Sequence, residues 1–169
     1  MPRSPWPTRE RRHWDCYDSG MIDPVTASAA PTGAPAATGA PPAGDPIVGI
    51  WEAHFREPAA SVANARAVLD DAASDDRMRA WAELTIGWHQ LYFTADPAAA
   101  GATLPLALER FVRVGERRGE LLARIGIARH KLVQQQPGVA RTELLAFYDE
   151  AMATLTPQDR FWAINALGA

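Results

Sequence analysis

The chain has 169 residues with 47% hydrophobic content, enough for one globular domain and hardly for two. Its net charge of −3 excludes the broad basic field that draws a protein to nucleic acid or anionic lipid. Cys16 is the only cysteine, which excludes an intramolecular disulfide and a multi-cysteine metal site within one chain. The apolar runs fall far short of the roughly 20 residues that cross a bilayer. No apolar segment follows the basic N-terminal residues, so we expect a cytoplasmic protein without a secretory signal or membrane association.

Residues 1–45 differ in composition from the rest of the chain. They contain eight of the 14 prolines, and between Ala27 and Gly44 the only apolar residues are alanine and proline. Such a segment cannot bury enough surface to offset the entropy lost on ordering, so we predict a disordered tail that acts as a tether. Met21 starts a stretch that resembles a natural protein start, which suggests that translation begins there.

Residues 46–169 have the apolar spacing of α-helices and no strand-length alternation. Asp45-Pro46, Asp96-Pro97 and Thr156-Pro157 each place a capping side chain before a proline, the typical start of a helix. The pattern predicts about seven helices with short connections. They are expected around residues 47–55, 62–72, 78–91, 104–112 (beginning near Pro105), 121–132, 144–155 and from residue 161 onward.

An aliphatic residue followed by glycine recurs in alternate predicted helices. The glycines are Gly49, Gly87, Gly126 and Gly168, with spacings of 38, 39 and 42 residues. Since glycine costs a helix about 1 kcal/mol relative to alanine, its recurrence indicates close helix packing, although chance is the alternative. A second register, residues 82–91 against 123–132, gives an offset of 41. A helix pair that recurs at this interval predicts an antiparallel helix-pair solenoid.

The repeat resembles the tetratricopeptide superfamily. The residues that carry the likeness are Trp81, Ile86 and Gly87; Leu122, Ile125 and Gly126; Tyr148 and Ala151 before the Thr156-Pro157 turn; and the segment 163–168, AINALG. The spacing here is longer than the usual 34 residues of that superfamily. The resemblance implies an all-α, TPR-like solenoid over residues 46–169 that acts in protein–protein interaction.

In its general sequence character, the chain is also similar to the helical sensor regions that precede bacterial GGDEF diguanylate cyclase domains. No GGDEF string occurs in this sequence. The resemblance implies a signalling role, with an output domain of a parent chain as one partner. The sequence stops at Ala169, inside what would be the first helix of a pair. We therefore expect either a fragment of a longer regulator or self-association through the apolar face of that helix, formed by Phe161, Trp162, Ile164 and Leu167.

Three histidines fall on alternate predicted helices, His54, His89 and His130. Stacked repeats could bring three imidazoles together around zinc. However, their distances from the recurring glycine are five, two and four residues, so they do not share a helical phase. Packed or half-exposed histidines are therefore the favoured interpretation, and no metal or other cofactor is expected.

Basic residues gather in the middle of the domain, interleaved with Glu109, Glu116 and Glu120. They are Arg110, Arg113, Arg117, Arg118, Arg124, Arg129 and Lys131. The spacing suits ion pairs on helix surfaces, which favours a solvated face over a phosphate or nucleic-acid site. Ser74 or Asp75 is expected to cap the helix that follows.

Nucleophile-elbow, phosphate-loop and zinc-protease motifs are all absent from the sequence, so an enzyme is not expected. The leading hypothesis is a non-catalytic protein-interaction or sensor module of a bacterial signalling protein, which binds through a concave helical surface. The alternative is a small-ligand regulator with a tryptophan-lined groove, although core packing is the favoured role of those rings. The candidate binding residues are Trp51, Trp81, Trp88, His89, Arg129 and His130.

Overall fold

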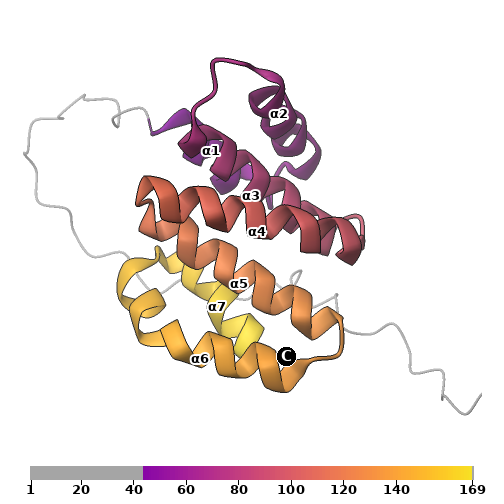
Figure 1. Ribbon diagram of the computed structural model, residues 1–169, viewed down its shortest axis with the longest axis vertical. Coiled ribbons are helices and arrows are strands. Elements are labelled where there is room, and N and C mark those ends of the chain that lie inside the picture. The colour runs from indigo at the N-terminus through magenta and orange to yellow at the C-terminus, as the bar shows by residue number, and fades with distance from the viewer. Residues whose placement is uncertain (1–43, 169) are drawn as a thin grey trace, which may run out of the picture. The chain divides into compact units, whose positions relative to one another are not determined.

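A computed structural model describes residues 44–168, and these residues form helices joined by short turns (Figure 1). The helices are α1 (Pro46–Ala53), α2 (Pro58–Asp70), α3 (Asp76–Tyr92), α4 (Pro97–Val114), α5 (Arg117–Val133), α6 (Pro137–Thr154) and α7 (Pro157–Gly168). The expected all-α class and the number of helices are confirmed. The predicted disordered tail, apart from Gly44 and Asp45, and the proposed start at Met21 lie outside the described residues. Within the described part of the chain, no helix combines the length and the hydropathy needed to cross a membrane.

Side chains at the helix starts satisfy backbone N–H groups that have no partner within their own helix. Asp45 Oδ1 accepts a hydrogen bond from the Ile47 N–H at 3.1 Å, and Asp75 Oδ1 accepts one from the Met78 N–H at 2.8 Å. Asp96 Oδ1 accepts from the Ala99 N–H at 3.0 Å, and Thr156 Oγ1 from the Asp159 N–H at 3.2 Å. Asp75, and not Ser74, is therefore the cap of α3. These contacts confirm the helix starts that were predicted from the capping residues.

The Asp96-Pro97 cap and the apolar spacing predicted different starts for α4, and only the cap was right. We expected this helix to begin near Pro105, but it begins at Pro97, and Pro105 lies in its interior. A proline inside a helix removes one backbone hydrogen bond and costs roughly 3 kcal/mol. The Asp96 cap and the burial of Ala100 and Leu104, both fully inaccessible, offset that cost.

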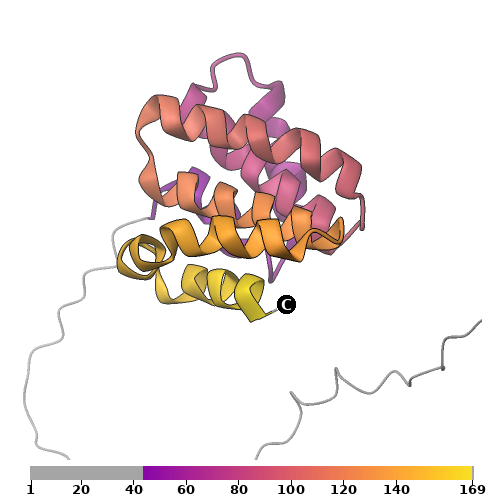
Figure 2. The ribbon, with the colours of Figure 1, turned by 60° about the horizontal axis from the view of Figure 1, so that its bottom comes forward.

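The seven helices pack in a regular order (Figures 1 and 2). Each helix contacts the next one in the chain, and each odd-numbered helix also contacts the next odd-numbered helix. The even-numbered helices α2, α4 and α6 make no such contacts with one another. The predicted stack of antiparallel helix pairs would give this pattern, and that arrangement stays a prediction. We call the side on which the odd-numbered helices contact one another the inner side. The relationship to tetratricopeptide repeats stays a prediction.

Leu104 of α4 fills a niche between the two neighbouring odd-numbered helices. A Cβ atom added to Gly87 of α3 would lie 2.6 Å from Leu104 Cδ2, and one added to Gly126 of α5 would lie 3.1 Å from the same atom. Close helix packing therefore explains two of the four recurring glycines. A Cβ atom at Gly49 would meet nothing within 4 Å, so packing does not explain that glycine.

We expect Gly87→Ala to lower the free energy of unfolding by about 1–3 kcal/mol, because the added methyl group overlaps a fully buried leucine. The matched variant Gly49→Ala should instead raise it by up to about 1 kcal/mol, since alanine favours the helix and has open space. Urea unfolding of both variants measures the two values. Equal effects would contradict the close approach of α3, α4 and α5 at Leu104.

Candidate functional site

The inner side of the stack holds a cluster of aromatic side chains, which we call the inner cluster: Trp51 and Phe55 near α1, Trp88 and Tyr92 on α3, and Trp162 on α7. The rings of Trp51 and Trp88 lie 5.4 Å apart, and Tyr92 stacks on Trp88 at the same distance. Trp162 stacks on Phe55 at 4.1 Å. A side chain just after α1 and one on α7 therefore meet on the inner side, where the sequence had led us to expect a concave binding surface.

The tryptophans proposed as groove residues are core residues. Trp51, Trp81 and Trp88 are 2%, 1% and 0% exposed. Trp81 lies apart from the other two, packed edge-on against Phe111 at 5.1 Å. The three tryptophans therefore do not line a groove, because their rings are buried in the packing between helices and no face of them is open to a ligand.

Asp159 joins three helices beneath the inner cluster. Its carboxylate accepts hydrogen bonds from Trp51 Nε1 at 3.1 Å, Arg118 Nε at 2.8 Å and the Thr156 hydroxyl at 2.7 Å. Only 2% of Asp159 is exposed. Arg118 also pairs with Glu52 at 3.2 Å. This carboxylate therefore ties α1 and α5 to the start of α7.

Two of the three histidines are neighbours. His54 is fully buried, and its ring lies 5.7 Å from that of His89. Neither nitrogen of His54 has a hydrogen-bond partner in residues 44–168. Burial, with a smaller contribution from His89, lowers the pKa of His54 to about 4, and burial lowers the pKa of His89. Among the described residues, no three His, Cys, Asp or Glu side chains are placed to hold a metal ion.

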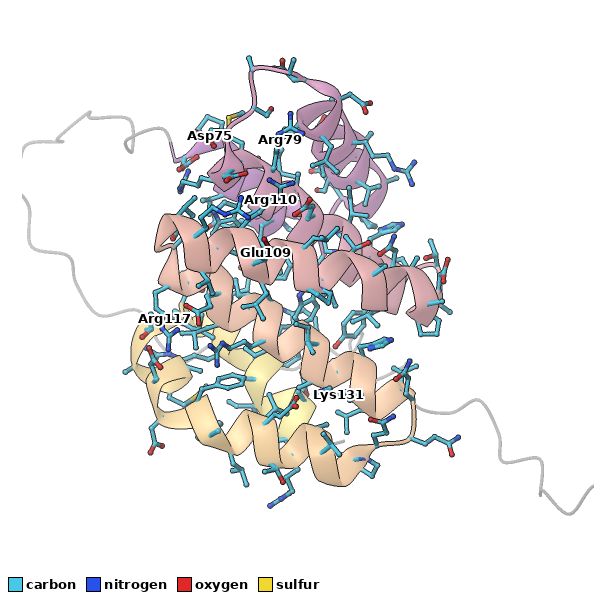
Figure 3. All side chains as sticks on the ribbon, viewed as in Figure 1. Asp75, Arg79, Glu109, Arg110, Arg117 and Lys131 are labelled. Atoms are coloured by element: carbon cyan, nitrogen blue, oxygen red, sulfur yellow. The ribbon has the colours of Figure 1, made fainter. Side chains whose placement is uncertain are left out.

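The basic residues are mostly engaged with carboxylates on other helices. Figure 3 shows Arg110 and Glu109 on α4, and Arg117 and Lys131 towards opposite ends of α5. The pairs are Arg110 with Asp76 and Glu83, Arg113 with Asp76 and Glu109, Arg117 with Glu120 and Glu150, Arg118 with Asp159 and Glu52, Arg124 with Glu120, and Lys131 with Glu143. Ion pairing was expected, and most of the pairs connect helices. Arg129 differs, because its guanidinium lies over the Tyr92 ring at 5.6 Å and has no carboxylate partner in the described range.

Two hollows lie side by side on α5, between α4 and α6, and we call them together the α5 groove. The larger, of about 430 Å³, is lined by Leu108 of α4, by Arg124, Ile127 and Lys131 of α5, and by Glu143, Ala146 and Phe147 of α6. The smaller, of about 240 Å³, shares Ile127 and Lys131 and extends to Gly101, Leu104, Pro105, His130, Gln134 and Gln136. The α5 groove therefore has an apolar floor and walls with charged groups along them.

His130, one of the predicted binding residues, lies at the smaller hollow. A Cβ atom added to Gly101 would stand 2.8 Å from His130 Cε1, so glycine allows the imidazole to lie directly against α4. His130 Nε2 has no hydrogen-bond partner among the described residues. The structure does not bring His130 together with His54 and His89 in one metal site.

A third hollow, of about 600 Å³, lies at the turn between α5 and α6. Its lining consists of Arg129, Leu132, Val133, Gln135 and Pro137. Arg129 and His130 thus lie at separate hollows, and neither of these hollows includes Trp51, Trp88 or His89. The six predicted binding residues do not form one site.

The outward face of α7 is partly apolar. Phe161 and Ile164 are 55% and 53% exposed, whereas Trp162 is half-buried against Phe55. The sequence predicted that Phe161, Trp162, Ile164 and Leu167 form an apolar face without a following partner helix. Of these, Trp162 and Leu167 pack against the core, and Phe161 and Ile164 stay exposed.

The α5 groove was not predicted from the sequence. One feature could have indicated it: Ile127, an apolar residue, falls beside the buried positions of α5, between Arg124 and Lys131. Which side chains face it from α4 and α6 depends on how these helices pack. Comparisons with protein-family models, curated proteins and solved structures gave no match.

Proposed function

We propose that this chain is a non-catalytic protein-interaction module that binds a segment of its partner in the α5 groove. The observation that carries the proposal is the pair of adjacent hollows that share Ile127 and Lys131, between α4 and α6, whose backbones make no close contact with each other. A groove between helices with an apolar floor is a common mode of peptide recognition.

The other surfaces of the described residues offer less to a partner than the α5 groove does. The inner side, the expected place of a concave binding surface, is filled with the chain's own rings. The charged clusters on α3 and α4 serve helix packing: Arg110, for example, joins Asp76 and the nearly buried Glu83. The α5 groove combines apolar side chains with exposed charge.

The resemblance to sensor regions ahead of GGDEF domains gives the biological setting of the proposal. In that setting, the partner segment belongs to an output domain or to another component of a bacterial signalling protein. A module of this kind transmits a signal by binding, and its own residues perform no reaction.

The proposal predicts that bulk placed in the α5 groove abolishes partner capture. Ala146 is exposed and lines the larger hollow, so Ala146→Tyr should block binding without disturbing the core. Ala153→Tyr is the matched control, because Ala153 is exposed on the same helix and lies outside the groove lining. Affinity capture with the full chain, followed by mass spectrometry, should recover a partner with the wild type and the control and lose it with Ala146→Tyr. A partner that all three forms retain would contradict the proposal.

A small-ligand regulator remains the second candidate, because a hollow of about 430 Å³ has the size of many ligand sites. Ala146→Tyr separates the two ideas when combined with thermal melting. A metabolite that raises the melting temperature of the wild type but not of Ala146→Tyr, with no captured protein, would favour the ligand.

A further inference from the structure

We infer that the α5 groove recognises an acidic peptide segment, with an aliphatic or aromatic side chain between its carboxylates. This inference rests on the proposed function and specifies the chemistry of the partner segment.

The dimensions of the groove fit a short peptide. Its floor runs along α5 from Arg124 to Gln134. At a rise of 1.5 Å per residue, this stretch is about 15 Å long, the length of four or five extended residues or of about three helical turns.

Apolar side chains reach the groove from three helices. Leu108 of α4, Ile127 of α5 and Phe147 of α6 line the larger hollow, and Phe147 is only 9% exposed. Together they form a site for one apolar side chain of a partner, which would bury most of its surface there.

The charges of the lining favour a negative partner. The groove lining contains two permanent cations, Arg124 and Lys131, and one carboxylate, Glu143. The chain as a whole has a net charge of −3, so the positive lining opposes the overall balance. Complementary charge raises the association rate and selects among partners.

The carboxylate that already pairs with Lys131 is easily replaced. In this ion pair, the side chains of Lys131 and Glu143 are 26% and 42% exposed. An ion pair of this kind contributes little to stability, because water screens it. A carboxylate of the partner can therefore take the place of Glu143. Arg124, at the other end of the groove, is 42% exposed and pairs with Glu120 of its own helix; a second partner carboxylate can replace Glu120 there, because Glu120 keeps its ion pair with Arg117.

A nucleic acid fits this surface less well than an acidic peptide. Its evenly spaced phosphates would approach Glu120, Glu143 and Glu150, which stand among the cations. A peptide can present one or two carboxylates to the cations and keep neutral residues elsewhere.

The test is selection from a random 12-residue peptide library displayed on phage, with the full chain as target. Ala146→Tyr is used for counter-selection, and Ala153→Tyr serves as the control. The expected result is a set of peptides that bind the wild type and the control but not Ala146→Tyr, with Asp or Glu on both sides of an apolar residue. Groove-dependent peptides without acidic enrichment would overturn the inference and leave the proposed function standing. The absence of any groove-dependent peptide would count against both.

Two charge variants then give effects of opposite sign on a selected peptide. Lys131→Gln should weaken binding about fivefold, the equivalent of one exposed ion pair. Glu143→Gln should tighten binding, because it removes the competing carboxylate. Asp149→Asn, on the exposed side of α6 and outside the groove lining, should leave the affinity unchanged. Fluorescence anisotropy measures each affinity, and weaker binding by Glu143→Gln would overturn the inference.

Discussion

Asp159→Ala is expected to lower the free energy of unfolding by about 3 kcal/mol. The substitution deprives the buried indole N–H of Trp51 of its hydrogen-bond acceptor and takes the nearer carboxylate from Arg118. Breaking a buried ion pair from one side typically costs 3–5 kcal/mol, and the lower value applies because Arg118 is 21% exposed and keeps Glu52. Such a loss is a large fraction of the 5–15 kcal/mol that stabilises a typical domain. Urea unfolding followed by circular dichroism measures it.

Two further variants make the Asp159 prediction specific. Asp149→Ala removes an exposed carboxylate of α6 and should change stability by less than about 0.5 kcal/mol. Asp159→Asn keeps an acceptor for Trp51 but loses the charge opposite Arg118, so its effect should lie between the other two. A loss of less than about 1 kcal/mol for Asp159→Ala would show that this carboxylate does not hold α1, α5 and α7 together.

The stability of the wild-type chain is expected to fall by about 3 kcal/mol between pH 7 and pH 4 through His54 alone. The ordinary pKa of this imidazole is 6.5, and burial lowers the pKa in the folded chain to about 4. Between these values the unfolded chain binds a proton that the folded chain does not, so stability increases with pH. The contribution of neutral His54 is therefore complete above pH 6.5 and is lost as the pH falls towards 4. Each pKa unit corresponds to 1.36 kcal/mol.

His54→Phe isolates this contribution from the carboxylates that titrate in the same range. Phenylalanine fills the space between Phe55 and Phe93 and has no group to protonate. The difference in unfolding free energy between the variant and the wild type should grow by about 3 kcal/mol from pH 7 to pH 4. A difference that is constant across this range would mean that His54 is protonated, or open to water, in the folded chain.

Local chemistry explains why so much of the fold could be predicted. A cap such as Asp96 and a proline at the next position act on the residues beside them, so the sequence reveals them directly. Pro105 misled the prediction because its cost is local, whereas the burial that offsets it comes from neighbouring helices. The phase argument separated all three histidines, but the rings of His54 and His89 lie 5.7 Å apart, because His54 follows α1 and packs against α3.

The candidate site could not be predicted in the same way, because distant segments build it. The contact of Trp51 with Asp159 joins residues 108 positions apart, and no local pattern marks it. The tryptophans were considered as groove residues because they are large and amphipathic, but in the structure their side chains are buried in the core. The α5 groove takes its walls from α4 and α6, whose backbones make no close contact, and their separation is visible only in three dimensions.

Chemical-shift mapping of a selected peptide on the isotope-labelled full chain tests the central claim most directly. If the α5 groove is the binding surface, the shifted amides should lie around residues 101–108, 124–134 and 143–147. Shifts confined to the outward face of α7 at Phe161 and Ile164, or to the inner cluster around Trp88, would contradict the claim and place the binding surface elsewhere.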